Sequence, residues 1–84
     1  MEELILPVIH MNGSGSRILS RDYDKAYSAL LQAIEEFQSV TFHSRDYYVI
    51  SPDAFEKARV KRAEMYEKLE SVREYLEIHI NHVS

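Results

Sequence analysis

Apolar side chains recur every three or four positions along two long stretches of the chain, as they do on one face of an α-helix. In residues 17–39 this stripe consists of Leu19, Tyr23, Ala26, Leu30, Ala33 and Phe37, widened by Tyr27 and Ile34. In residues 52–82 it consists of Phe55, Ala58, Met65, Leu69, Val72 and Leu76, continued by Val83. Arg62 and His79 fall on this second stripe. The pattern predicts two amphipathic helices.

The residues at the ends of both stretches favour these limits. Ser16 or Ser20 supplies the hydroxyl that an N-cap uses at the first helix. Before the second helix, Ser51 is the expected N-cap, Pro52 the first helical residue and Asp53 an acid in the first turn. We therefore predict helices over 17–39 and 52–82.

The remaining segments read as extended chain and turns. Residues 4–9 are an apolar run that predicts a short strand within 1–10, at a sheet edge or split, because Pro7 cannot donate a ladder hydrogen bond. Asn12-Gly13 is a turn signal inside a Gly/Ser loop, residues 11–16. The connector, residues 40–51, is rich in β-branched and aromatic residues, which favours an extended segment with a strand around 47–50. Whether this segment is a strand or a loop stays open.

Together these elements predict one mainly α domain over residues 1–84, an antiparallel two-helix hairpin with a short N-terminal strand. A chain of 84 residues buries a thin core, and it has no cysteine to add a disulfide. Tyr66 and Ile80 form a second stripe on the second helix, off the first. We therefore expect the hairpin to assemble as a homo-oligomer.

The net charge of the chain argues against some classes of binding partner. The net charge is −4 and the pI about 5.5, which argues against sequence-independent binding of DNA or RNA. No apolar run approaches the roughly 20 residues of a spanning helix, and Glu2 and Glu3 precede residues 4–9 where a signal peptide carries basic residues. We expect a cytoplasmic protein without a membrane partner.

The first candidate for binding is the Gly/Ser loop with its flanks. Backbone N–H groups at a helix start favour anions, and hydroxyls, an amide and a guanidinium surround them here. The candidate residues are His10, Asn12, Gly13, Ser14, Ser16 and Arg17. No Gly-Lys-Ser/Thr follows, and no third glycine, so neither a Walker loop nor a dinucleotide fingerprint is present. The structural alternative is a turn followed by an N-cap.

The second candidate is the Arg45-Asp46-Tyr47-Tyr48 segment. Arginine can hold a phosphate with two hydrogen bonds, and tyrosine can stack on a base. The alternative is an Arg–Asp turn with one tyrosine packed inward and one outward. Arg62 either pairs with an acid of the first helix or Asp46, or points into a shared pocket.

Catalytic and metal chemistry find little support in the sequence. His79 and His82 are spaced i,i+3, but no acid is fixed beside them, so we expect no metal site and no cofactor. His79, near the end of the predicted helix, is more simply a satisfied interfacial histidine. Ser14, Ser16 and His10 lack a nucleophile elbow and a carboxylate to orient the base, and we expect no enzymatic activity.

Two short motifs and the start of the second helix carry a resemblance to a known family. They are a His-x-Asn-Gly-Ser block at His10–Ser14, the Arg-Asp-Tyr-Tyr block, and Asp53, Ala54, Phe55 and Ala58. In this order they resemble a family of short bacteriophage and prophage proteins, which often have a Pro-Asn-Gly-type turn where this chain has Phe42-His43-Ser44. The resemblance implies a phage accessory protein of the host cytoplasm. Some small oligomeric phage proteins sequester nucleotide-type immune signals, an analogy of size and context.

Two functions follow as expectations. In the first, the homo-oligomer binds a nucleotide-derived anion where the Gly/Ser loop meets the connector, within one chain or from a neighbouring subunit. In the second, the hairpin is a structural or protein-interaction module without a small-molecule ligand.

Overall fold

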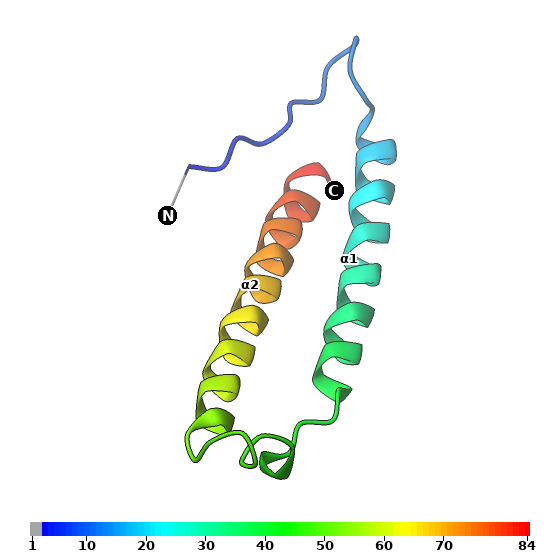
Figure 1. Cartoon of the computed structure of the whole chain (residues 1–84). Helices are drawn as coiled ribbons and strands as arrows, with labels where there is room; N and C mark the ends of the chain where they lie inside the picture. Colours follow the sequence, from blue (N-terminus) through cyan, green and yellow to red (C-terminus); the bar gives the residue numbers. More distant parts are fainter. Residues whose placement is uncertain (1–2) are drawn as a thin grey trace.

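The computed structural model describes residues 3–84, which form an antiparallel helical hairpin (Figure 1). Helix α1 spans Ser16–Ser39 and α2 spans Ala54–Val83, with the single-turn 3₁₀ helix η1, Ser44–Asp46, between them. The predicted mainly helical hairpin is confirmed, and the helix limits lie within two residues of those expected. Over the described residues, neither helix has a stretch long and apolar enough to cross a bilayer.

The hairpin is far longer than it is wide. Its principal extents are 61 × 25 × 16 Å and its radius of gyration is 18.4 Å, whereas a compact domain of this length would have a radius of about 12 Å. Every residue therefore lies near the surface, and only one layer of side chains can be buried between the helices.

The buried layer is correspondingly thin. Among the described residues, the buried hydrophobic side chains are Ile34, Leu76 and Val83, and His79 is buried with them. The predicted stripe was too wide on the α1 side, because Ala26 and Ala33 are exposed and α1 turns Tyr27 and Ile34 toward α2 instead. On α2, the expected seam residue Val72 is also half exposed.

Both helices begin differently from the prediction. The N-cap of α1 is Gly15, so Ser16 is already helical and no side chain caps this end. The N-cap of α2 is Asp53 rather than Ser51, and Pro52 lies in the turn before the helix. Ser51 donates its hydroxyl to the Asp53 carboxylate at 2.9 Å, which also pairs with Lys57 at 3.0 Å. The contact with Lys57 and the hydrogen bond from Ser51 lower the pKa of Asp53, and its side chain makes no capping hydrogen bond to α2.

The predicted N-terminal strand is wrong over the residues that the structure describes. Residues 3–10 have no strand pairing, and the first two residues of the predicted strand lie outside the described part. The segment instead crosses toward the end of α2 (Figure 1), where His82 Nε2 donates to the Pro7 carbonyl at 2.7 Å. An apolar run favours extended chain, but a ladder needs a partner strand, and the described part of this chain offers none.

Of the two conformations left open for residues 47–50, strand or loop, the structure has the loop. The connector folds into consecutive turns, in which the backbone N–H groups of Tyr47 and Tyr48 donate to the Ser44 carbonyl at 3.0 Å. The rings of Phe42, Tyr47 and Phe55 pack together with centroids 5.0 to 6.0 Å apart. Phe42 and Tyr47 lie in the connector, and Phe55 lies in the first turn of α2. Their rings can meet only if the chain between them turns back, so this cluster accompanies the bend of the connector.

Candidate functional site

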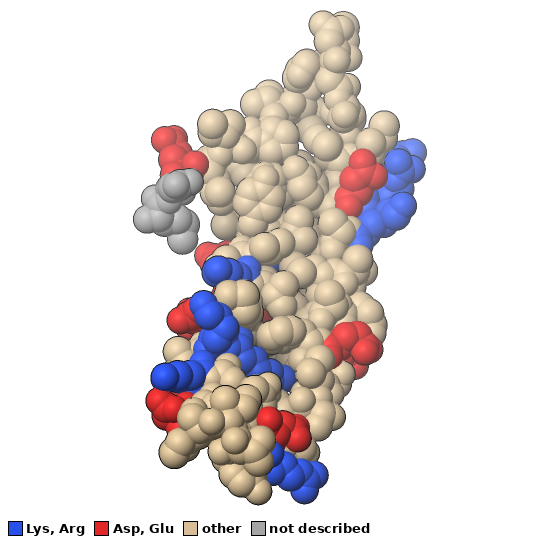
Figure 2. Space-filling view, viewed as in Figure 1, with Lys and Arg blue, Asp and Glu red and all other residues tan. Residues whose placement is uncertain are grey.

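A hollow of about 440 Å³ lies at the connector end of the hairpin, between the last turn of α1 and the first turns of α2. It is lined by Phe37, Gln38, Phe42, Phe55, Arg59, Arg62, Ala63, Tyr66 and Glu67. Lys and Arg side chains gather over the adjoining half of α2 (Figure 2). Aromatic walls with two guanidinium groups are suited to a ligand that is both flat and negatively charged.

Arg62 is the predicted site residue that lines this hollow. Its guanidinium donates to the carbonyls of Phe37 at 3.3 Å and Gln38 at 3.4 Å, in the last turn of α1. It also lies 4.9 Å from the centre of the Phe42 ring and 5.5 Å from that of Phe37. Of the two alternatives for Arg62, the ion pair with an acid is therefore not formed, and the guanidinium instead caps α1, because the free carbonyls at the end of a helix attract a cation.

Arg59 supplies the second cation of the hollow and is held by Glu56, one turn earlier on α2. Its guanidinium donates two hydrogen bonds to the Glu56 carboxylate. The pairing raises the pKa of Arg59 and lowers that of Glu56, so both groups are charged at neutral pH. Because this pair is exposed, a stronger anion can compete with Glu56 for the guanidinium at little cost.

The other predicted group lies at the opposite end of the hairpin. The turn at Asn12-Gly13 is confirmed by a hydrogen bond from the Gly13 N–H to the His10 carbonyl at 3.2 Å. All the predicted binding residues here, His10, Asn12, Gly13, Ser14, Ser16 and Arg17, are exposed. The outer face of α1 next to them has an open depression of about 600 Å³, and three basic residues line it: Arg17, Arg21 and Lys25.

The two predicted groups do not meet within one chain. The Gly/Ser loop precedes α1 and the connector follows it (Figure 1), and a helix of 24 residues holds its ends about 36 Å apart. A site formed by both groups therefore needs the loop of one copy and the connector of another.

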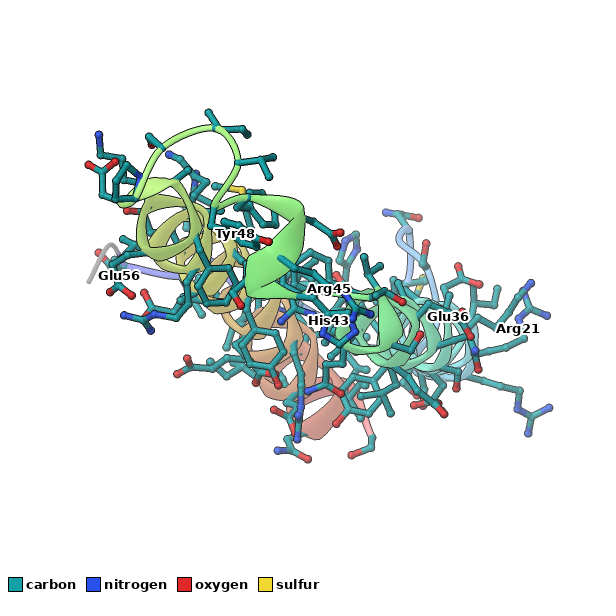
Figure 3. The ribbon with its side chains drawn as sticks, turned by 60° about the horizontal axis from the view of Figure 1, so that its bottom comes forward. Arg21, Glu36, His43, Arg45, Tyr48 and Glu56 are labelled. Atoms are coloured by element: carbon teal, nitrogen blue, oxygen red, sulfur yellow. The ribbon has the colours of Figure 1, made fainter. Side chains whose placement is uncertain are left out.

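Of the four predicted binding residues in the connector, one packs against other side chains and three are exposed to solvent. Tyr47 packs against Phe42 and Phe55, whereas Tyr48 is 62% exposed. Arg45 and Asp46 are also exposed. Figure 3 looks onto this end and shows Tyr48 by the start of α2, with Arg45 near the end of α1. The inward and outward tyrosines were expected from strand alternation, but it is the turn geometry that separates them.

Several residues of the hollow were missed by the sequence analysis: Phe37, Phe42, Phe55, Arg59 and Tyr66. The α2 members were accessible, since Arg59, Arg62 and Tyr66 follow an i, i+3, i+7 spacing that places them on one face. The α1 and connector members become neighbours only once the connector turns back on itself.

Gly13 gives the first testable prediction. A Cβ at this position would lie 2.6 Å from His10 Nε2, whereas one at Gly15 would meet no atom within 4 Å. We expect Gly13→Ala to displace the His10 ring and shift its NMR signals, while stability changes by less than about 0.5 kcal/mol, because the ring is exposed and can rotate. Gly15→Ala is the control and should leave the His10 signals in place. Unchanged signals in Gly13→Ala would refute the packing of this ring on the turn.

Comparison with known proteins assigns the chain to no family: no family model, curated protein or solved structure matches it.

Proposed function

We propose that this protein is a homo-oligomer that binds an anionic, nucleotide-derived small molecule at the connector end of the hairpin. The observation that carries the proposal is the hollow of about 440 Å³, where Arg59 and Arg62 lie beside aromatic rings. This volume falls in the range of small-molecule sites, about 300–1,000 Å³.

The chemistry of the hollow supports a nucleotide over other anions. Phe37 and Tyr66 line the hollow with ring centroids 6.4 Å apart, and bases stack on the faces of aromatic side chains. Guanidinium groups bind phosphate oxygens with paired hydrogen bonds. The Tyr66 hydroxyl accepts from the Gln38 amide at 2.8 Å, which fixes the ring at the rim.

The surface of the single chain supports assembly. One copy exposes 6750 Å², whereas a compact monomer of 9.9 kDa would expose about 5,200 Å². The excess of about 1,500 Å² exceeds the roughly 800 Å² that each partner buries in a standard interface. In an oligomer, the exposed Gly/Ser loop of one copy can add its N–H groups and hydroxyls to the connector end of another.

The biological role that we propose is sequestration. The resemblance to small phage proteins suggests a host signal as the ligand, and nucleotide derivatives serve as immune signals in the host. A protein that binds such a signal without converting it lowers its free concentration. No step of catalysis is needed for this role.

The test is isothermal titration calorimetry of the purified protein against cyclic dinucleotides and ADP-ribose derivatives, with adenosine as the uncharged control. We expect saturable heat for at least one phosphate-bearing ligand and none for adenosine, because binding depends on the guanidinium groups. If no member of the panel binds with a Kd below about 100 μM, which corresponds to a binding free energy of about −5.5 kcal/mol, the proposal fails.

A second function is favoured by one observation. Arg62 is already engaged as the cap of α1, so the hollow can be a structural feature of a hairpin that acts through its exposed apolar residues. Under this alternative the protein is a structural or interaction module, and removing Arg62 would lower its stability without any ligand-dependent effect.

A further inference from the structure

The two guanidinium groups of the hollow are held by different kinds of partner. Arg62 donates to the carbonyls of Phe37 and Gln38, which belong to the backbone at the end of α1. Arg59 donates from Nε at 3.0 Å, and from Nη2, to the two carboxylate oxygens of Glu56. The carbonyls are fixed by the helix, whereas an exposed carboxylate can rotate away about its side-chain bonds. Arg59 is therefore the cation of the hollow that can change its partner.

The carboxylate of Glu56 occupies donors of Arg59 that a bound anion would use. A guanidinium binds a carboxylate or a phosphate with two parallel N–H donors. In Arg59 the pair formed by Nε and Nη2 is taken by the two oxygens of Glu56. Because the carboxylate also cancels the guanidinium charge at close range, an anion at the remaining donors is attracted only weakly while Glu56 stays in place.

With Glu56 on Arg59, the hollow and its edge have no net positive charge. The residues that line the hollow carry two positive charges, on Arg59 and Arg62, and one negative charge, on Glu67. Glu56 adds a second negative charge, which is present at neutral pH because the pairing lowers the pKa of this carboxyl. The two lysines that flank Arg59 on α2 are paired with acids as well. The hollow gains a positive charge only when Glu56 moves away.

We propose that Glu56 determines the specificity of the hollow, as an internal competitor that keeps simple anions from Arg59 and yields to a ligand that also contacts the aromatic wall. This inference rests on the proposed function, because it concerns the same site. For inorganic phosphate, displacement of Glu56 exchanges one ion pair for another. A nucleotide derivative also stacks its base on the rings of the hollow. Discrimination of this kind needs a penalty against the wrong ligand as well as contacts to the right one.

The size of this penalty follows from the exposure of the pair. Glu56 precedes Arg59 by three residues on one helix, so it competes at every ligand concentration. Both side chains are more than half exposed, and an ion pair of this kind changes an equilibrium constant by about two- to fivefold. Such a penalty is small for a ligand that stacks and pairs, but it matters for a free anion, whose own attraction to an exposed guanidinium is equally weak.

The test is the substitution Glu56→Gln, which keeps the length of the side chain and removes its charge. In calorimetry at constant ionic strength, we expect the variant to bind ADP-ribose or cyclic di-AMP about two- to fivefold more tightly than the unmodified protein. We also expect millimolar inorganic phosphate to weaken this binding more in the variant than in the unmodified protein, because phosphate then meets no competitor at Arg59.

Glu64→Gln is the matched control. Glu64 pairs with Lys61 at 3.1 Å, with the same i,i+3 spacing, and neither residue lines the hollow. This substitution changes the net charge by the same amount, so it should alter neither the binding of the nucleotides nor the effect of phosphate. Equal tightening in both variants would show a general effect of charge and would overturn the inference.

A measurement without ligand tests the contact itself. The Nε–H of Arg59 should exchange with solvent faster in Glu56→Gln than in the unmodified protein, because a neutral amide oxygen is a weaker acceptor than a carboxylate. Glu64→Gln should leave this exchange unchanged. NMR of the labelled protein follows the Nε–H signal directly. If the exchange is equally fast in the unmodified protein and in Glu56→Gln, the pair is not held in solution and the inference fails.

The results with ligand separate this inference from the proposed function. If the unmodified protein binds ADP-ribose or cyclic di-AMP and Glu56→Gln binds it no more tightly, Glu56 is not a competitor, while the proposed function stands. If neither protein binds either ligand, the proposed function fails at this hollow and the role of Glu56 fails with it. Binding by Glu56→Gln alone would support the inference, since the internal carboxylate would then outweigh the ligand.

Discussion

Replacement of Arg62 by methionine is expected to weaken binding of a phosphate-bearing ligand by about ten- to a hundredfold and to lower the free energy of unfolding by about 1–2 kcal/mol. The guanidinium faces the hollow and also donates to the Phe37 and Gln38 carbonyls. Methionine keeps an unbranched apolar stem against Phe42 but has neither the charge nor the donors. Calorimetry measures the first effect and urea denaturation the second.

The matched control is Lys61→Met, one residue earlier on α2. Lys61 is exposed and contacts Glu64 at 3.1 Å, so its loss should change stability by less than about 0.5 kcal/mol and leave binding intact. Loss of stability in Arg62→Met without loss of binding would leave Arg62 with only its capping role. If binding is also absent in the unmodified protein, the interaction-module alternative gains support.

The two long helices were predictable because the spacing of apolar residues that indicates a helix recurs at every turn. A stripe of apolar residues over six turns or more outweighs any one misassigned position, and helix limits follow within a residue or two. The turn at Asn12-Gly13 was equally local, since it depends on the conformational preferences of two adjacent residues. The thin core was expected from the length of the chain.

The errors arose where the structure depends on residues distant in sequence. Residues 4–9 have the composition of a strand, yet their observed contact is one hydrogen bond from His82 to the Pro7 carbonyl. The connector has the same bias toward extended chain, but packing of Phe42 on Phe55 bends it. Strand propensity describes one segment, whereas pairing and ring packing require a second one.

In the candidate site, too, the features set by local sequence were predicted and those set by distant residues were missed. Arg62 stood out because a charge on an apolar stripe needs a partner, and it does have one. Of the two alternatives left open for Arg62, the structure has the pocket and not the ion pair. The carbonyls of Phe37 and Gln38 were not considered as partners, because the sequence patterns concern side chains. Arg59 was missed because its pairing with Glu56, at spacing i,i+3, resembles any exposed ion pair of a helix.

Replacement of His79 by alanine is expected to be among the most destabilising single changes in this chain, lowering the free energy of unfolding by about 3 kcal/mol. His79 is 2% exposed, and its ring lies 5.0 Å from that of Tyr23 and 4.1 Å from that of Tyr75. Alanine would leave a cavity between these two rings. A domain of this size has about 4–13 kcal/mol of stability in all, so thermal and urea denaturation should both show the loss clearly.

His82, one turn later, is the matched control. It is exposed and donates to the Pro7 carbonyl at 2.7 Å, so His82→Ala should release residues 3–10 at a cost of only about 0.5–1.5 kcal/mol. A second variant, His79→Phe, separates packing from hydrogen bonding. The ring is kept, and the bond that is lost runs from His79 Nδ1 to the Tyr75 carbonyl, an acceptor that the helix backbone already uses.

We therefore expect His79→Phe to retain most of the stability that His79→Ala loses. If the two variants are equally unstable, the hydrogen bond from Nδ1 to the Tyr75 carbonyl within α2 accounts for the lost stability, and the aromatic packing against Tyr23 does not. If His79→Ala is no worse than His82→Ala, packing of the Tyr23, His79 and Tyr75 rings does not hold the loop end of the hairpin. The comparison matters for the binding site as well, because the Gly/Ser loop precedes α1, and the contact of Tyr23 with His79 is one of those that join the first half of α1 to α2.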